Sequence, residues 1–308
     1  MQTLRSNSRN FALQTVFFAV LITAMVPVRT TASAEPKVPE GVVFEQDIEY
    51  SNPDNQHLQL NMARPKKGKG PFPGIVCIHG GGFRAGTREG FNQLCIRLAE
   101  HGYVAVTVTY RLAPKYQFPA AVYDVKAAVR WMRANADQYN VDPQRIGTTG
   151  GSAGGHLAQF LAVTRGVKEF EGNGGNAEFS SSVACVVNFY GPSDLTKSYD
   201  ASVDAAEVLP LFLGGDLKQE RHRHIIASPL YWVTPDAAPT LCVQGTEDRY
   251  VAYDQAVWLI DKLKAADVEA KLMTIEGADH GFRGASQEVK DQIEAARIAF
   301  FDKHLKQD

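Results

Sequence analysis

A serine between glycines is the first residue in the sequence whose setting favours chemistry. It lies in Gly150-Gly151-Ser152-Ala153-Gly154, between a partly β-branched segment, 145–149, and a helix-forming segment, 156–163. A tight turn from a strand into a helix needs small residues on both sides of the serine, because bulk there would collide with neighbouring backbone. Such a turn exposes the Ser152 hydroxyl and directs the N–H of Ala153 toward an anion formed beside it. The pattern is common by chance, so its meaning depends on the rest of the chain.

A base and an acid with suitable positions occur later in the chain. A serine hydroxyl is a weak nucleophile that needs a base, and the base needs an orienting acid. Among eight histidines, His280 lies in a glycine-containing loop just after a predicted strand, at the sheet edge expected for Ser152. The acid is expected between the two in chain order. Asp248 follows the strand predicted at 240–244, so we expect Ser152, Asp248 and His280 to act together.

A glycine run supplies candidate donors for a negatively charged oxygen. His79-Gly80-Gly81-Gly82 directly follows the buried strand predicted at 74–78. Glycines let backbone N–H groups face a substrate atom with no side chain in the way. The N–H groups of Gly81, Gly82 and Ala153 are therefore the predicted oxyanion hole.

These motifs resemble the α/β-hydrolase fold and, within it, the HGGG branch that includes hormone-sensitive lipase. The resemblance covers nearly all of 42–305 and is carried by segments 79–82, 110–114, 118–121 and 150–154. It implies roles for several residues at once: Ser152 as nucleophile, Asp248 as acid, His280 as base, and His79, Arg111 and Asp124 as structural support of the site.

A narrower resemblance rests on loops. The glycine loop 171–176, the segment 190–195 and the N-terminal pattern are similar to exported bacterial esterases that remove acetyl or feruloyl groups from xylan-type polysaccharide. Hormone-sensitive-lipase relatives usually carry a helical N-terminal cap. Here segment 42–50 already reads as a strand, so no large cap domain is expected.

Strand and helix patterns alternate along the rest of the chain. This alternation predicts an α/β fold with a mostly parallel sheet of about eight strands and helices on both faces. Segments 42–50 and 57–63 are expected to form an antiparallel hairpin, and 42–308 a single domain. Two stretches, 165–182 and 191–239, interrupt the alternation. We expect both at the carboxyl ends of the strands, as walls of the site or a partial cap.

The N-terminus has the composition of an export signal. Arg5 and Arg9 precede an uncharged apolar run, 11–26, and small residues end at Ala34. This order is typical of a signal peptide at 1–34, and 35–41 would be a loose leader. The apolar run is short for a membrane span. We expect a secreted or periplasmic protein with no stable membrane association after cleavage, the alternative being an uncleaved N-terminal anchor.

The overall composition narrows the range of partners. The chain has 308 residues, a formal net charge of −2 and no long run of one sign, which argues against nucleic acid as a partner. Four cysteines lie in apolar segments without metal-ligand spacing, so we expect buried free thiols, no metal and no cofactor. The oligomeric state is left open.

The sequence thus predicts a secreted serine carboxylic-ester hydrolase. Its expected substrates are short acyl esters, either small esters or acylated polysaccharide. Three alternatives stay open: a peptidase of prolyl-oligopeptidase type, a lipase of the same branch, and a non-catalytic binding protein on the same scaffold.

Overall fold

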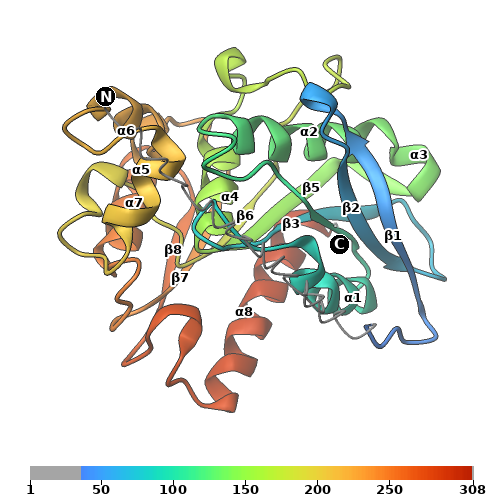
Figure 1. Ribbon diagram of the computed structural model, residues 1–308. Helices are drawn as coiled ribbons and strands as arrows, with labels where there is room; N and C mark the ends of the chain where they lie inside the picture. The colour runs from blue at the N-terminus through green and yellow to red at the C-terminus, as the bar shows by residue number, and fades with distance from the viewer. Residues whose placement is uncertain (1–35, 307–308) are drawn as a thin grey trace, which may run out of the picture. The chain divides into compact units, whose positions relative to one another are not determined.

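The structure, a computed structural model, describes residues 36–306. The predicted signal peptide at 1–34 lies outside the described residues. Figure 1 shows a central sheet of eight strands in the order β1-β2-β4-β3-β5-β6-β7-β8. Within 36–306, no helix is both long enough and apolar enough to cross a bilayer.

The elements alternate along the chain as predicted. The strands are β1 (Val42–Ser51), β2 (Leu58–Pro65), β3 (Phe72–Ile78), β4 (Val104–Val108), β5 (Val141–Gly151), β6 (Val186–Phe189), β7 (Thr240–Gly245) and β8 (Ala270–Ile275). The α-helices are α1 (Asn92–Glu100), α2 (Ala120–Ala134), α3 (Ala136–Tyr139), α4 (Ala153–Val163), α5 (Ala205–Leu213), α6 (Arg221–Ile226), α7 (Asp254–Ala265) and α8 (Gln287–Leu305). β2 pairs antiparallel with β1 and β4, and the remaining pairs are parallel. The predicted mostly parallel sheet with an antiparallel hairpin is confirmed.

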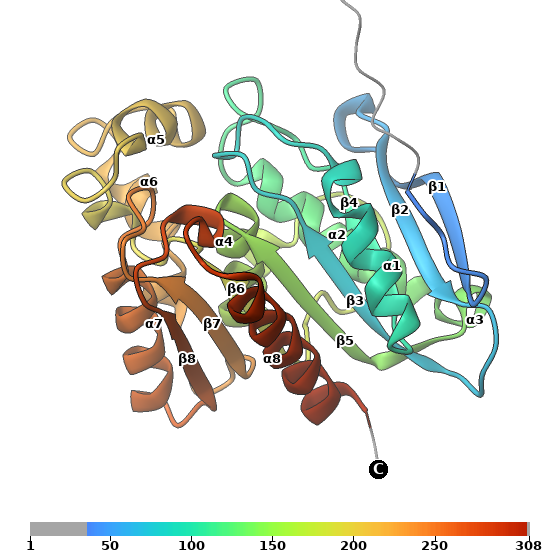
Figure 2. The same cartoon turned by 90° about the horizontal axis from the view of Figure 1, so that it is seen from below.

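Helices cover both faces of the sheet. α1 and α8 lie side by side on one face (Figure 2), and their apolar side chains share a core with Ile75 and Cys77 of β3. Val76 and Ile78 point to the opposite face, into the core formed with α2, α4 and α7. Because β3 is buried on both sides, its apolar residues are continuous rather than alternating. All four cysteines are buried free thiols, as expected.

The prediction for segment 165–182 is wrong. α4 starts at the carboxyl edge of the sheet and returns the chain to the opposite edge, so the segment that follows α4 lies where β6 begins. There the Glu171 carboxylate accepts hydrogen bonds from Lys126 Nζ at 2.9 Å and Arg130 Nη1 at 2.8 Å. Both basic side chains are buried on α2. Segment 165–182 therefore packs against α2 and does not form a wall of the site at the carboxyl edge of the sheet.

A buried ion pair connects the segment after β4 to α2. The backbone N–H of Arg111 donates to Asp124 Oδ2 at 2.8 Å, and its guanidinium lies 2.9 Å from Asp124 Oδ1. The hydroxyl of Tyr110 donates to the carbonyl of His79 at 3.0 Å, and the N–H of Ala113 to the carbonyl of Phe83 at 2.9 Å. The Arg111–Asp124 pair therefore fixes the segment 110–113, which in turn holds the loop 79–83.

We predict that Asp124→Asn lowers the free energy of unfolding by about 3 kcal/mol, because it removes the buried partner of a buried guanidinium. Asp54→Asn is the matched control. Asp54 also contacts Arg111, at 2.6 Å, but its side chain is 61% exposed. Its loss should cost less than about 1 kcal/mol in urea denaturation. Equal losses for the two variants would contradict the importance of the buried pair.

Candidate active site

Ser152 lies on a strained turn between β5 and α4. Its backbone has φ 57° and ψ −123°, a region that residues other than glycine rarely adopt. The N–H of Ser152 donates to the carbonyl of Phe189 at 2.9 Å, and its carbonyl accepts from the N–H of His156 at 2.9 Å. A Cβ on Gly154 would collide with the carbonyl of Ile78. The predicted glycine-flanked turn from strand to helix is therefore present, and packing against β3 and β6 maintains it.

Asp248 and His280 are in direct contact. Asp248 follows β7 and His280 follows β8, and His280 Nδ1 lies 2.8 Å from Asp248 Oδ2. The Asp248 carboxylate is buried and also accepts from the N–H groups of Tyr250 and Val251, each at 2.9 Å, and from Gln244 Nε2 at 3.1 Å. These donors hold the carboxylate in place. His280 Nδ1 then carries the proton, which leaves Nε2 free to accept another.

The neighbouring acids are oriented away from this contact. Asp279 forms ion pairs with Arg249 at 2.8 Å and Arg283 at 3.0 Å. The hydrogen bond from Arg249, together with the backbone N–H of His280, holds the pKa of Asp279 well below its usual range. Glu247 is exposed. Of these three acids, Asp248 is therefore the one whose carboxylate contacts the His280 ring.

The glycine loop after β3 offers unpaired N–H groups. Gly81 has φ 118° and Gly82 φ 58°, and the Gly81 carbonyl accepts from the N–H groups of Arg84 and Ala85 at 3.2 and 3.0 Å. Within 36–306, neither the Gly81 nor the Gly82 N–H has a hydrogen-bond acceptor. The N–H of Ala153 lies in the first turn of α4, where it has no acceptor within the helix. These three groups are available to an anionic oxygen.

One cavity of about 490 Å³ joins these groups. Its wall includes Ser152, His280, Gly81, Gly82 and Ala153. The side chains of Ser152 and His280 face it without a direct hydrogen bond to each other, which is common when no substrate is bound. The segment between β6 and β7 lines part of this cavity. Its apolar lining residues are Leu195, Val208 and Leu209, and its polar ones are Ser198, Ser202 and Asp204. The prediction that 191–239 forms a wall of the site is confirmed.

Two residues at the site have functions that the sequence did not suggest. The Tyr190 ring packs edge-on against the His280 ring, with 4.7 Å between centroids, on a backbone with φ 41°. Gln244, the buried amide within apolar β7, donates to Asp248. Gln244 is an amide in an otherwise apolar strand, and this pattern in the sequence could have indicated that its side chain has a polar partner. No local sequence pattern indicated the role of Tyr190, because its contact with His280 is between residues that follow different strands, β6 and β8.

The sheet order, the strained serine and the Asp248–His280 pair define an α/β-hydrolase of the hormone-sensitive-lipase-like branch. The family model of BD-FAE matches residues 60–263, and the chain belongs to this family.

Known proteins similar to the chain agree with this assignment. The "Probable carboxylic ester hydrolase LipM" of Mycobacterium tuberculosis is 34% identical over 63% of the chain and 46% of its own length. Among solved structures, a "Truncated form of carbohydrate esterase from gut microbiota" has a TM-score of 0.77 at 28% identity, covering 86% of this chain and 97% of that one. A propionate-bound esterase of Thermogutta terrifontis has a TM-score of 0.70 at 27% identity, covering 88% and 98%. The chain spans about half the length of the sequence relatives it matches first.

His156 anchors the loop after β6 from beneath the site. It is fully buried in α4, and its Nδ1 donates to the carbonyl of Pro192 at 3.0 Å. Burial lowers the pKa of His156 to about 4. In the unfolded chain this pKa is about 6.5. Between these two values the unfolded state binds a proton that the folded state does not, so this residue makes the fold less stable as the pH falls.

We predict that His156→Gln flattens the pH dependence of stability between about pH 6.5 and pH 4. In the parent, His156 should contribute a loss of up to about 1.4 kcal/mol per pH unit across this range. Urea denaturation at several pH values measures the slope. His222→Gln, which changes an exposed histidine, should keep the parent slope. A slope unchanged in His156→Gln would contradict the burial argument.

Proposed function

We propose that the chain is a serine carboxylic-ester hydrolase that works through Ser152, His280 and Asp248. The observation that carries the proposal is the 2.8 Å contact between Asp248 and His280 at the wall of the cavity that also contains Ser152. The names of LipM and of the structural neighbours support ester hydrolysis.

The proposed mechanism follows from which atoms are free. His280 Nε2 takes the Ser152 proton, because Nδ1 is occupied by Asp248, and Ser152 Oγ attacks the ester carbonyl. The N–H groups of Gly81, Gly82 and Ala153 stabilise the resulting oxyanion. The alcohol leaves with the proton from His280, and an acyl-enzyme remains. Water then attacks the acyl group by the same route, which releases the acid and restores Ser152. Asp248 stays ionised and stabilises the imidazolium.

We propose short acyl esters of carbohydrate, acetyl esters of xylan-type polysaccharide above all, as substrates. Val208 narrows the cavity beside the oxyanion loop: its methyl groups lie 3.3 Å from the position that a Cβ on Gly82 would occupy. Ser198, Ser202 and Asp204 offer polar groups to a sugar hydroxyl. Neighbours described as a carbohydrate esterase and as a propionate-bound esterase support this choice. Export, as the pattern of 1–34 indicates, would bring the protein to such polymers.

We predict that Ser152→Ala lowers kcat for p-nitrophenyl acetate at least about a thousandfold, because the nucleophile is lost. Ser202→Ala is the matched control, since it removes a hydroxyl from the same cavity. p-Nitrophenyl acetate has no sugar for this hydroxyl to bind, so the control should keep most of the activity on this substrate. A Ser152→Ala variant as active as the parent would refute the proposed mechanism. Parallel assays on p-nitroanilide substrates test the peptidase alternative, for which amide cleavage would match ester cleavage.

We predict that acyl size limits the reaction. kcat/KM should fall at least about tenfold from p-nitrophenyl acetate to the dodecanoate, and acetylated xylan should react faster than feruloylated xylan, because Val208 leaves little room for a long or bulky acyl group beside the oxyanion donors. Val208→Ala should raise the relative rate on longer chains. Val203→Ala changes an exposed valine outside the cavity wall and should not. A rate that rises steadily from acetate to dodecanoate would favour a lipase instead.

A further inference from the structure

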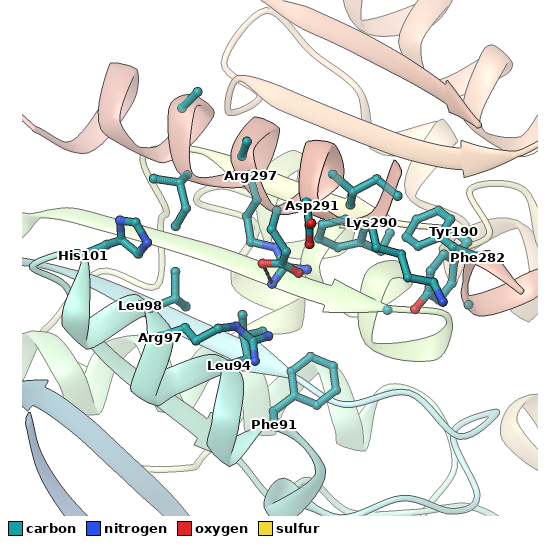
Figure 3. Close-up of a pocket in the computed structure, with 18 of the residues that line it drawn as sticks. Phe91, Leu94, Arg97, Leu98, His101, Tyr190, Phe282, Lys290, Asp291 and Arg297 are labelled. Carbon is teal, nitrogen blue, oxygen red and sulfur yellow. Dashed lines mark ion pairs between the residues drawn. The ribbon is translucent and has the colours of Figure 1, made fainter. Parts of the chain in front are cut away.

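A second and larger cavity lies between α1 and α8, on the face of the sheet opposite α4. Its volume is about 940 Å³ (Figure 3), within the range of small-molecule sites. Most of its lining is apolar, and four of these side chains are aromatic: Phe91, Phe189, Tyr190 and Phe282. The mechanism proposed above does not use this space.

Arg297 of α8 is the buried charge in this cavity. Only 8% of the residue is exposed, and its guanidinium carbon lies 4.2 Å from the centroid of the Phe189 ring. Within 36–306, its Nε and Nη1 make no hydrogen bond. In the described part of the chain its one ion-pair partner is Glu294, with 3.2 Å between Nη1 and Oε2 and a side chain that is 41% exposed. Arg97 is a second charged neighbour, of the same sign as Arg297. A buried guanidinium with unused donors is costly, and an anion that reached it would offset this cost.

The remaining charges of the cavity are already paired or lie at its mouth. Asp302 is paired with Lys306 at 2.6 Å, and Asp291 accepts from Gln287 at 2.8 Å. Arg97 of α1 and Lys290 of α8 are exposed, and both extend into the space between the helices (Figure 3). Neither forms an ion pair with another residue in the described part of the chain. At the mouth, Arg97 and Lys290 are balanced by the carboxylates of Asp291 and Glu294, so the excess positive charge for an anion is Arg297 inside the cavity. The two carboxylates disfavour a second negative charge on the ligand.

We propose that this cavity binds an organic monocarboxylate with a flat apolar body. The guanidinium of Arg297 supplies the buried positive charge that a carboxylate would pair with, and Nη2 is its nitrogen that is not sealed from the cavity. The aromatic rings and the aliphatic residues Leu94 and Leu98 would cover the body of the ligand. The site adjoins the catalytic cavity, with which it shares Phe91, Gly151, Tyr190 and Gly281, but its lining does not include Ser152 or His280. The inference does not depend on ester hydrolysis.

Isothermal titration of the full chain with benzoate tests the proposal, with benzamide as the neutral control. We expect saturable benzoate binding with a Kd of about 1 mM or below, and benzamide at least about tenfold weaker. Arg297→Met should weaken benzoate at least about tenfold. Lys290→Glu should weaken it about threefold, because it reverses a charge at the mouth. Lys264→Glu makes the same exposed charge change on α7 and should have no effect.

Ser202→Phe, which narrows the catalytic cavity, separates the two sites and should leave benzoate binding unchanged. Absence of saturation, equal binding of benzamide, or unchanged binding by Arg297→Met would overturn the proposal. So would loss of binding in Ser202→Phe alone, because the ligand would then occupy the catalytic cavity. Circular dichroism reports whether Arg297→Met folds. If Arg297→Met does not fold, the comparison between Lys290→Glu and Lys264→Glu tests the proposal instead. Equal benzoate affinities of these two variants would overturn it.

Discussion

The left-handed backbone of Ser152 is the constraint on which the site depends. A residue with a side chain adopts φ 57° only where its surroundings require it. Here β6 binds the Ser152 N–H through Phe189, and α4 must start so close to β3 that only glycine fits at position 154. Contacts with the neighbouring strands, and not the turn alone, maintain this strained backbone. The strained backbone places the serine hydroxyl at the sheet edge where the other parallel strands end.

The other candidate groups reach this edge on separate loops, each with its own anchor. Asp248 is held by two backbone N–H groups and by Gln244, so its carboxylate can direct the His280 ring. Asp279, the acid next to His280 in the chain, is paired with Arg249. The loop with the candidate oxyanion donors is held by the contacts of its own backbone with the rest of the sheet edge: the N–H of Ala113 donates to the carbonyl of Phe83, and the hydroxyl of Tyr110 to the carbonyl of His79. Preorganisation of this kind is what lets fixed dipoles stabilise charge in a transition state.

Tyr190 lies between the cavity that contains Ser152 and the cavity between α1 and α8. Its ring contacts His280 on one side and lines the space around Arg297 on the other. The cavity that contains Ser152 is lined by serine and histidine side chains as well as aromatic rings, whereas the larger cavity between α1 and α8 contains the buried Arg297. The fold therefore places two different binding environments on the two sides of Tyr190 and Phe91.

The sequence by itself determined the element order and the Ser152, Asp248 and His280 candidates, because buried parallel strands are continuous apolar runs and the chemistry sits just after them. It did not determine where segment 165–182 lies, since α4 carries the chain to the opposite edge of the sheet. Contacts between distant segments also escaped it: Tyr190 with His280, and Arg297 with Phe189. Local sequence patterns indicate turns and buried segments. Which side chains from distant segments come into contact depends on how the helices and strands pack in the folded protein.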